Sequence, residues 1–159
     1  MTHGNYAETL RQPGFFSFFN TQFLGAFNDN FLKMIVSFVA LNRAAGSADG
    51  YVELIAFLFI LPSALFSGYA GHLADVYSKR TILVAVKGFE IAIMVLTLAI
   101  FFIGAIEPML AAVFLMGLHA AFFSPAKYGI LPEMLPETEL SRGNGLLEMS
   151  TFKIGRAHV

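Results

Sequence analysis

Four apolar blocks, each long enough to cross a lipid bilayer, constrain the fold of this chain more than any other feature. A spanning helix needs roughly 20 mostly apolar residues, and none of the blocks alternates like a barrel strand. Four buried helices of a soluble protein are the alternative, but residues 108–126 contain no charged side chain, which a soluble helix rarely tolerates. We therefore predict an all-α, polytopic membrane helix bundle. The spans are expected at about residues 15–41, 51–70, 82–106 and 109–131, and a fifth begins near residue 140.

The composition agrees with this class and excludes several functions. Of the 159 residues, 57% are hydrophobic and 13% are charged, whereas soluble domains carry about a quarter charged residues. A formal net charge of -1 argues against a nucleic-acid binder with a basic surface. Because the chain has no cysteine, a disulfide framework and a Cys-ligated metal site are excluded. We predict no catalytic residue, no metal site and no cofactor, and the lipid bilayer is the first expected partner.

The charged residues of the short loops predict the orientation of the chain in the membrane. Residues 1–14 are polar and do not read as a signal peptide, so they are expected to form a cytoplasmic segment before the membrane domain at 15–153. Basic residues in short loops favour the cytoplasmic side, and only Arg43 falls on the opposite side. The residues expected in the cytoplasm are Arg11, Lys79, Arg80 and Arg142.

The first span carries polar residues that lipid cannot satisfy. At 100° per residue these residues share one helical face, and a charge near the bilayer centre costs about 2.5–3.5 kcal/mol even on lenient scales. We interpret the stripe as the lining of a substrate pathway, extended by Asn28 and Asn30; an Asp29–Lys33 pair that only fixes helix packing is the alternative. The stripe consists of Gln22, Ala26, Asp29, Lys33 and Ser37, and opposite it lie Phe23, Phe27, Phe31 and Phe38.

The end of the fourth span is the second candidate for pathway residues. Pro125 is expected to kink the helix near Lys127, and Tyr128 adds an amphipathic ring of the kind found at an interface or a head-group site. A lysine that snorkels from a helix end is the alternative interpretation of Lys127. His119, about two turns earlier, is read as a packed histidine, with a proton carrier as the alternative.

Other spacings predict helix contacts. Lys87 and Glu90 are three residues apart in the third span and are expected to neutralise one another. Pro62 predicts a bend in the second span. Small residues four apart let membrane helices approach closely, and such pairs are Ala64/Gly68, Ser67/Gly71 and Gly117/Ala121.

The loop between the second and third spans carries a signature. Its sequence, GHLADVYSKRTIL over residues 71–83, resembles the signature loop of the major facilitator superfamily. Val76 and Ser78 replace the arginine and glycine usual there, so part of the charge network of the family is missing. The resemblance implies a transporter fold and a gating role for residues of this loop, namely Gly71, Leu73, Asp75, Lys79 and Arg80.

Two further strings narrow the resemblance. Residues 22–33 (QFLGAFNDNFLK) and 124–131 (SPAKYGIL) are similar to the bacterial lysophospholipid transporter group of that superfamily. The resemblance implies inward movement of lysophospholipids across the cytoplasmic membrane by alternating access, for reacylation. It also implies an acyltransferase/acyl–acyl-carrier-protein synthetase as a separate or fused partner. In this group Asp29 is expected to meet the ammonium of the head group, and Lys127 the phosphate.

The length is that of part of such a transporter. The family is built from two six-helix halves with the site between them, whereas this chain has four spans and the start of a fifth. We expect a partial N-terminal half whose missing C-terminal half is a partner, followed by a non-native tail at 154–159; a genuine short protein is the alternative. The membrane part of a fused reacylating enzyme, or a facilitator for a drug or a sugar, are the alternative functions.

Overall fold

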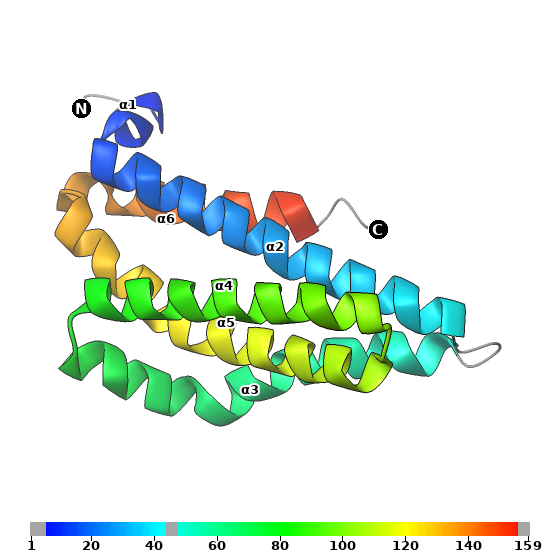
Figure 1. Ribbon diagram of the computed structural model, residues 1–159. Helices are drawn as coiled ribbons and strands as arrows, with labels where there is room; N and C mark the ends of the chain where they lie inside the picture. Colours follow the sequence, from blue (N-terminus) through cyan, green and yellow to red (C-terminus); the bar gives the residue numbers. More distant parts are fainter. Residues whose placement is uncertain (1–5, 44–47, 156–159) are drawn as a thin grey trace. The chain divides into compact units, whose positions relative to one another are not determined.

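The computed structural model describes residues 6–43 and 48–155, and every element within these ranges is a helix (Figure 1). The all-α prediction is therefore confirmed. The helices in chain order are α1 (Tyr6–Arg11), α2 (Pro13–Arg43), α3 (Ala48–Val76), α4 (Lys79–Ile103), α5 (Ile106–Met134) and α6 (Glu137–Gly155).

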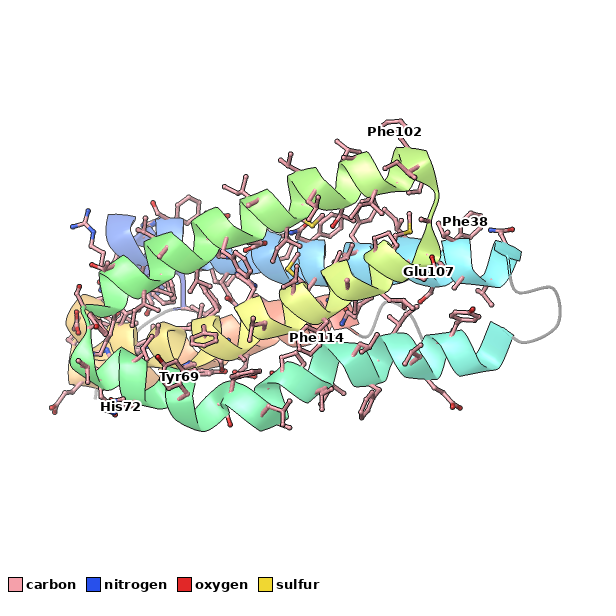
Figure 2. The ribbon with its side chains drawn as sticks, turned by 60° about the horizontal axis from the view of Figure 1, so that its bottom comes forward. Phe38, Tyr69, His72, Phe102, Glu107 and Phe114 are labelled. Atoms are coloured by element: carbon pink, nitrogen blue, oxygen red, sulfur yellow. The ribbon has the colours of Figure 1, made fainter. Side chains whose placement is uncertain are left out.

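Four of the described helices are long and apolar enough to cross a membrane. Their candidate spans are 14–42 in α2, 50–76 in α3, 79–103 in α4 and 106–134 in α5. Each of the four apolar blocks of the sequence thus corresponds to one such helix. Lipid-facing helices require apolar surfaces, and the surface of these helices carries many large apolar side chains, such as Phe102, which is 81% exposed and points away from the ribbon in Figure 2.

The third and fourth spans begin about three residues earlier than expected. Gly104 has φ 72° and ψ 18°, a left-handed conformation that ends α4 at Ile103, and its amide donates to the carbonyl of Ile100 at 2.9 Å. Helix α5 then starts at Ile106, with Glu107 in its first turn. Pro108 fits there because the first amides of a helix have no partner inside it.

The two ends of the chain also differ from the expectation. A short helix, α1, lies inside the predicted polar segment 1–14. Helix α6 extends the short fifth block as far as Gly155, so Ile154 and Gly155 of the expected tail are helical. The remaining tail residues, 156–159, lie outside the described residues.

The chain divides into two compact units, and each has its own apolar core. The first contains the residues up to Asn30 and those from Tyr128 onward. Its core joins the start of α2, the end of α5 and helix α6 through Phe15, Leu131, Leu135, Leu146 and Leu147. The side-chain amide of Gln12 donates to Glu139 Oε2 at 3.1 Å, and Glu139 Oε1 lies 3.8 Å from Arg142 Nη2. These contacts hold the residues between α1 and α2 against α6.

The second unit, Phe31–Lys127, contains the end of α2, helices α3 and α4 and most of α5. In it α3, α4 and α5 run alongside one another (Figure 1). The core is aliphatic, and methionines fill the space between the helices. It includes Leu32, Val36, Ile55, Ile93, Ile100, Met109, Val113 and Met116.

Pro62 bends one helix of this second unit, and Gly117 allows two of its helices to approach closely. Pro62 lies inside α3 and is buried, and α3 changes direction near its middle (Figure 1), as predicted. Gly117 of α5 meets the backbone of Phe59 in α3 so closely that no Cβ would fit. This confirms close approach for one of the small-residue pairs. The expectation of close helix contact is wrong for Gly68 and Gly71, because no atom of the described residues lies within 4 Å of a Cβ added at either position.

Candidate functional site

In the structure, the polar stripe of α2 and its phenylalanine face lie on different sides of the helix, and they differ in burial. Gln22 and Ala26 are each 7% exposed, and Asp29, Lys33 and Ser37 are half-buried. The four phenylalanines expected on the other face are all exposed: Phe23, Phe27, Phe31 and Phe38. The helix therefore turns its polar residues away from the surface that its aromatic side chains cover.

The asparagines that flank Asp29 are half-buried and belong to the same region of α2. The side-chain amide of Asn30 donates to the carbonyl of Ala26 at 2.7 Å, one turn earlier in the same helix. This bond satisfies a polar group inside an apolar helix without a partner from elsewhere in the fold.

Lys33 has an aromatic neighbour that the sequence did not indicate. Its Nζ lies 4.3 Å from the centroid of the Phe59 ring in α3. A cation over an aromatic face gains about 0.5–2 kcal/mol, more when it is desolvated. Lys33 is thus held by α3 within the second unit, while Asp29 belongs to the first.

Lys127 and Tyr128 are adjacent in α5 but have different surroundings. Lys127 is 6% exposed, so its side chain does not extend to the surface of the described chain as a snorkelling lysine would. Tyr128 is partly exposed, and its hydroxyl donates to Glu148 Oε1 in α6. Glu148 was missed from the sequence, because it lies 20 residues away on a different helix.

A charged cluster lies between α4 and α5, outside the predicted pathway. Lys87 Nζ donates to Glu90 Oε2 at 2.6 Å, which confirms that these two residues neutralise one another. The same oxygen lies 3.1 Å from His119 Nε2. The ring of Phe123 stacks on His119 with centroids 5.8 Å apart, and Lys87 Nζ lies 4.6 Å from the centroid of that same ring.

The sequence offered one signal for this cluster. A glutamate inside an apolar helix is costly unless it is paired, so Glu90 required a partner at bilayer depth. Its spacing from Lys87 satisfied that requirement within α4, and therefore nothing pointed to His119 on α5. The approach of His119 to the same carboxylate oxygen as Lys87 is visible only once the helices are packed.

The connection between α3 and α4 is shorter than the loop expected over residues 71–83. The signature residues lie in the two helices, with Gly71, Leu73 and Asp75 in α3 and Lys79 and Arg80 in α4. Helix α3 ends at Val76, one residue after Asp75, and α4 begins at Lys79. The Tyr77 amide donates to the Leu73 carbonyl at 2.9 Å, and Ser78 occupies the N-cap of α4 without a side-chain capping bond. Asp75 and Arg80 are exposed, and Gly71, Leu73 and Lys79 are half-buried.

Comparison with known proteins identifies relatives over most of the chain. A family model described as Major Facilitator Superfamily matches residues 18–153. A protein of Salmonella arizonae named "Lysophospholipid transporter LplT" is 33% identical over 144 residues, and a protein of Salmonella typhimurium with the same name is 34% identical. Both alignments cover 91% of this chain and 34% of the relative, so the chain spans about a third of the length of these curated relatives. No solved structure matches the chain.

Proposed function

This chain belongs to the major facilitator superfamily, and from that premise we propose that it forms the N-terminal part of a transporter that moves lysophospholipids across the bacterial cytoplasmic membrane. The two relatives described above carry the name of a lysophospholipid transporter. Transport agrees with the four membrane-length helices among the described residues.

The observation that carries the proposal is the burial of Lys127 inside an apolar helix. It is 6% exposed in the described chain, in a helix whose residues 108–126 contain no charged side chain. A buried ammonium in a membrane helix is costly and is by default a functional residue. A phosphate is the anion that a lysine point charge binds in many proteins, and a lysophospholipid head group carries one.

Asp29 supplies the complementary charge in this proposal. It is half-buried on the polar stripe of α2, beside Asn28 and Asn30. We assign the carboxylate to the ammonium of a zwitterionic head group, with the asparagine amides and Gln22 as hydrogen-bonding neighbours. The exposed phenylalanines of the chain provide apolar surface for an acyl chain.

The proposed orientation places the N-terminus and the α3–α4 loop in the cytoplasm. Lys79 and Arg80 stand at the start of α4, and Arg11 ends α1. Short loops rich in lysine and arginine stay on the cytoplasmic side. We further propose that a C-terminal half completes the pathway, and that an acyltransferase/acyl–acyl-carrier-protein synthetase, separate or fused, consumes the imported lipid.

Uptake of labelled lysophosphatidylethanolamine by spheroplasts that express the complete gene tests the function. We expect Asp29→Ala and Lys127→Ala to lower the uptake rate at least tenfold, because a lost charge-assisted contact of about 1.5–3 kcal/mol corresponds to a tenfold change or more. Arg11→Ala and Glu107→Ala are the matched controls, since both residues are exposed at helix ends.

Each outcome of this assay bears on a different part of the proposal. Uptake by the unmodified protein with no loss in Asp29→Ala and Lys127→Ala contradicts the head-group assignment. No uptake of the labelled lysolipid, together with uptake of a drug or a sugar, contradicts the substrate class. Immunoblots of the membrane fraction establish that every variant is present at the same level.

A further inference from the structure

The cluster of Lys87, Glu90 and His119 contains two buried ionisable side chains, and burying an ionisable group inside a membrane helix is costly. Glu90 is 6% exposed and His119 is 3% exposed. Glu90 lies eleven residues after the start of α4 and His119 thirteen residues after the start of α5. At 1.5 Å per residue these positions are about 16 and 20 Å along their helices, so both lie well inside a hydrocarbon core of about 30 Å.

The charge state of the cluster depends on one proton. With the lysine protonated, the glutamate ionised and the imidazole neutral, the three groups sum to zero. Nε2 lies 3.1 Å from the carboxylate oxygen, and neither ring nitrogen makes a hydrogen bond among the described residues. A neutral imidazole carries a hydrogen on one of its two nitrogens and a lone pair on the other. That lone pair is available for a second proton.

We propose that His119 is a proton-binding site whose counter-ion is Glu90. A proton from water binds the lone pair of the neutral ring, and the net charge of the three groups rises from zero to +1. Imidazole is the side chain that titrates near neutral pH. The Phe123 ring stacked on His119 also favours the cationic form, because an aromatic face attracts a cation.

Proton binding at His119 has a consequence for Lys87. Both bases face the same glutamate oxygen and the same phenyl ring. When the imidazole becomes cationic, the two positive groups repel one another and share one negative charge. Lys87, whose side chain is 20% exposed, has the flexible stem that lets it move away, whereas the His119 ring is enclosed.

The other titratable groups of the second unit lie farther along the helices. On α5 itself the next ionisable side chains are Glu107, in the first turn, and Lys127. On α3, Tyr69 contacts the ring of Phe122 at 6.1 Å, and on α2 Lys33 is held by Phe59. Among the described residues, Glu90 and the Phe123 ring both contact the imidazole.

A small cavity beside His119 is apolar. It has a volume of about 240 Å³ and is lined by His119 together with Ala85, Val86, Phe89, Leu118 and Phe122. An apolar wall offers no second acceptor for the protonated ring. The carboxylate of Glu90 is therefore the group on which proton binding depends, and this dependence can be measured.

The test is a pH titration of ring nitrogen signals in the chain reconstituted in lipid nanodiscs with ¹⁵N-labelled histidine. The His119 signal is assigned by its loss in His119→Gln. His72, exposed at the end of α3 and directed away from the bundle in Figure 2, is the internal reference. We expect the ring nitrogen signals of His119 to change with pH as one proton binds.

Two variants separate a functional cluster from a merely packed histidine. Glu90→Gln removes the charge that stabilises the imidazolium, and Lys87→Met removes the charge that opposes it. We expect the midpoint of His119 to move by about one pH unit or more in opposite directions in the two variants, and to stay constant in Glu107→Gln. A His119 signal that is constant over the whole pH range overturns the proposal. Midpoints that stay unchanged in both variants also overturn it.

Discussion

The contact between Gly117 and Phe59 makes a quantitative prediction about the packing of α3 on α5. A Cβ at position 117 would lie 2.9 Å from the carbonyl carbon of Phe59 and 3.1 Å from its Cα, with the carbonyl oxygen nearer still. These are backbone atoms, which cannot swing aside as the end of a flexible side chain can. In Gly117→Ala the two helices must therefore separate where they cross.

The expected change in the free energy of unfolding of Gly117→Ala is the sum of two opposing contributions. Overpacking a tight core costs about 1–3 kcal/mol, and rigid backbone atoms favour the upper part of this range. Alanine in place of glycine inside a helix returns up to about 1 kcal/mol. We expect Gly117→Ala to lower the free energy of unfolding by about 2 kcal/mol. Neighbouring core residues of α5, Val113 and Met116, lose contacts with α3 as the helices part.

Gly68→Ala is the matched control. Gly68 also lies inside a membrane-length helix, but nothing lies within 4 Å of a Cβ added there. Only the helix-propensity term applies, so its free energy of unfolding is expected to stay constant or to rise by up to about 1 kcal/mol. Unfolding by SDS in mixed micelles, followed by circular dichroism, measures both variants. Equal effects of the two substitutions would refute the reasoning.

Two further predictions concern the ends of the helices. Gly104→Ala is expected to lower the free energy of unfolding by about 1–2 kcal/mol, because position 104 is left-handed (φ 72°). Gly88→Ala, in open space within α4, should not lower it. Equal losses in the two variants would contradict the role given to the left-handed conformation of Gly104. Since the chain has no cysteine, Ser78→Cys should react with an impermeant maleimide only after cell lysis, whereas Gly50→Cys should react in intact spheroplasts. The reverse pattern contradicts the proposed orientation.

The number and type of the membrane-length helices could be predicted from the sequence, because crossing a bilayer is a requirement on consecutive residues. Twenty apolar residues in a row satisfy it whatever they pack against. Contacts between residues of one helix could be predicted for the same reason. Lys87 and Glu90 meet because the helix itself brings residues three apart together. The boundaries were less accurate, since the left-handed Gly104 ends α4 about three residues before the apolar pattern does.

Which faces meet could not be predicted from the sequence. Three small-residue pairs suggested close helix contact, yet Gly117 alone of the three glycines tested has a backbone against it among the described residues. Likewise, the polar stripe of α2 was recognised, but its contact with the ring of Phe59 was not. Spacing along one helix defines a face, and it contains no information about the rotation and register of the neighbouring helix.

The sequence by itself thus determined the membrane class, the helices and the family, because these depend on runs of residues and on a loop motif. The tertiary structure decided that His119 of α5 lies against Glu90 of α4 and that Phe123 stacks on its ring. That arrangement turns a local ion pair into a three-group cluster. The physical reason is that charge interactions in a low-dielectric interior depend on distances across helices, and packing alone establishes those distances.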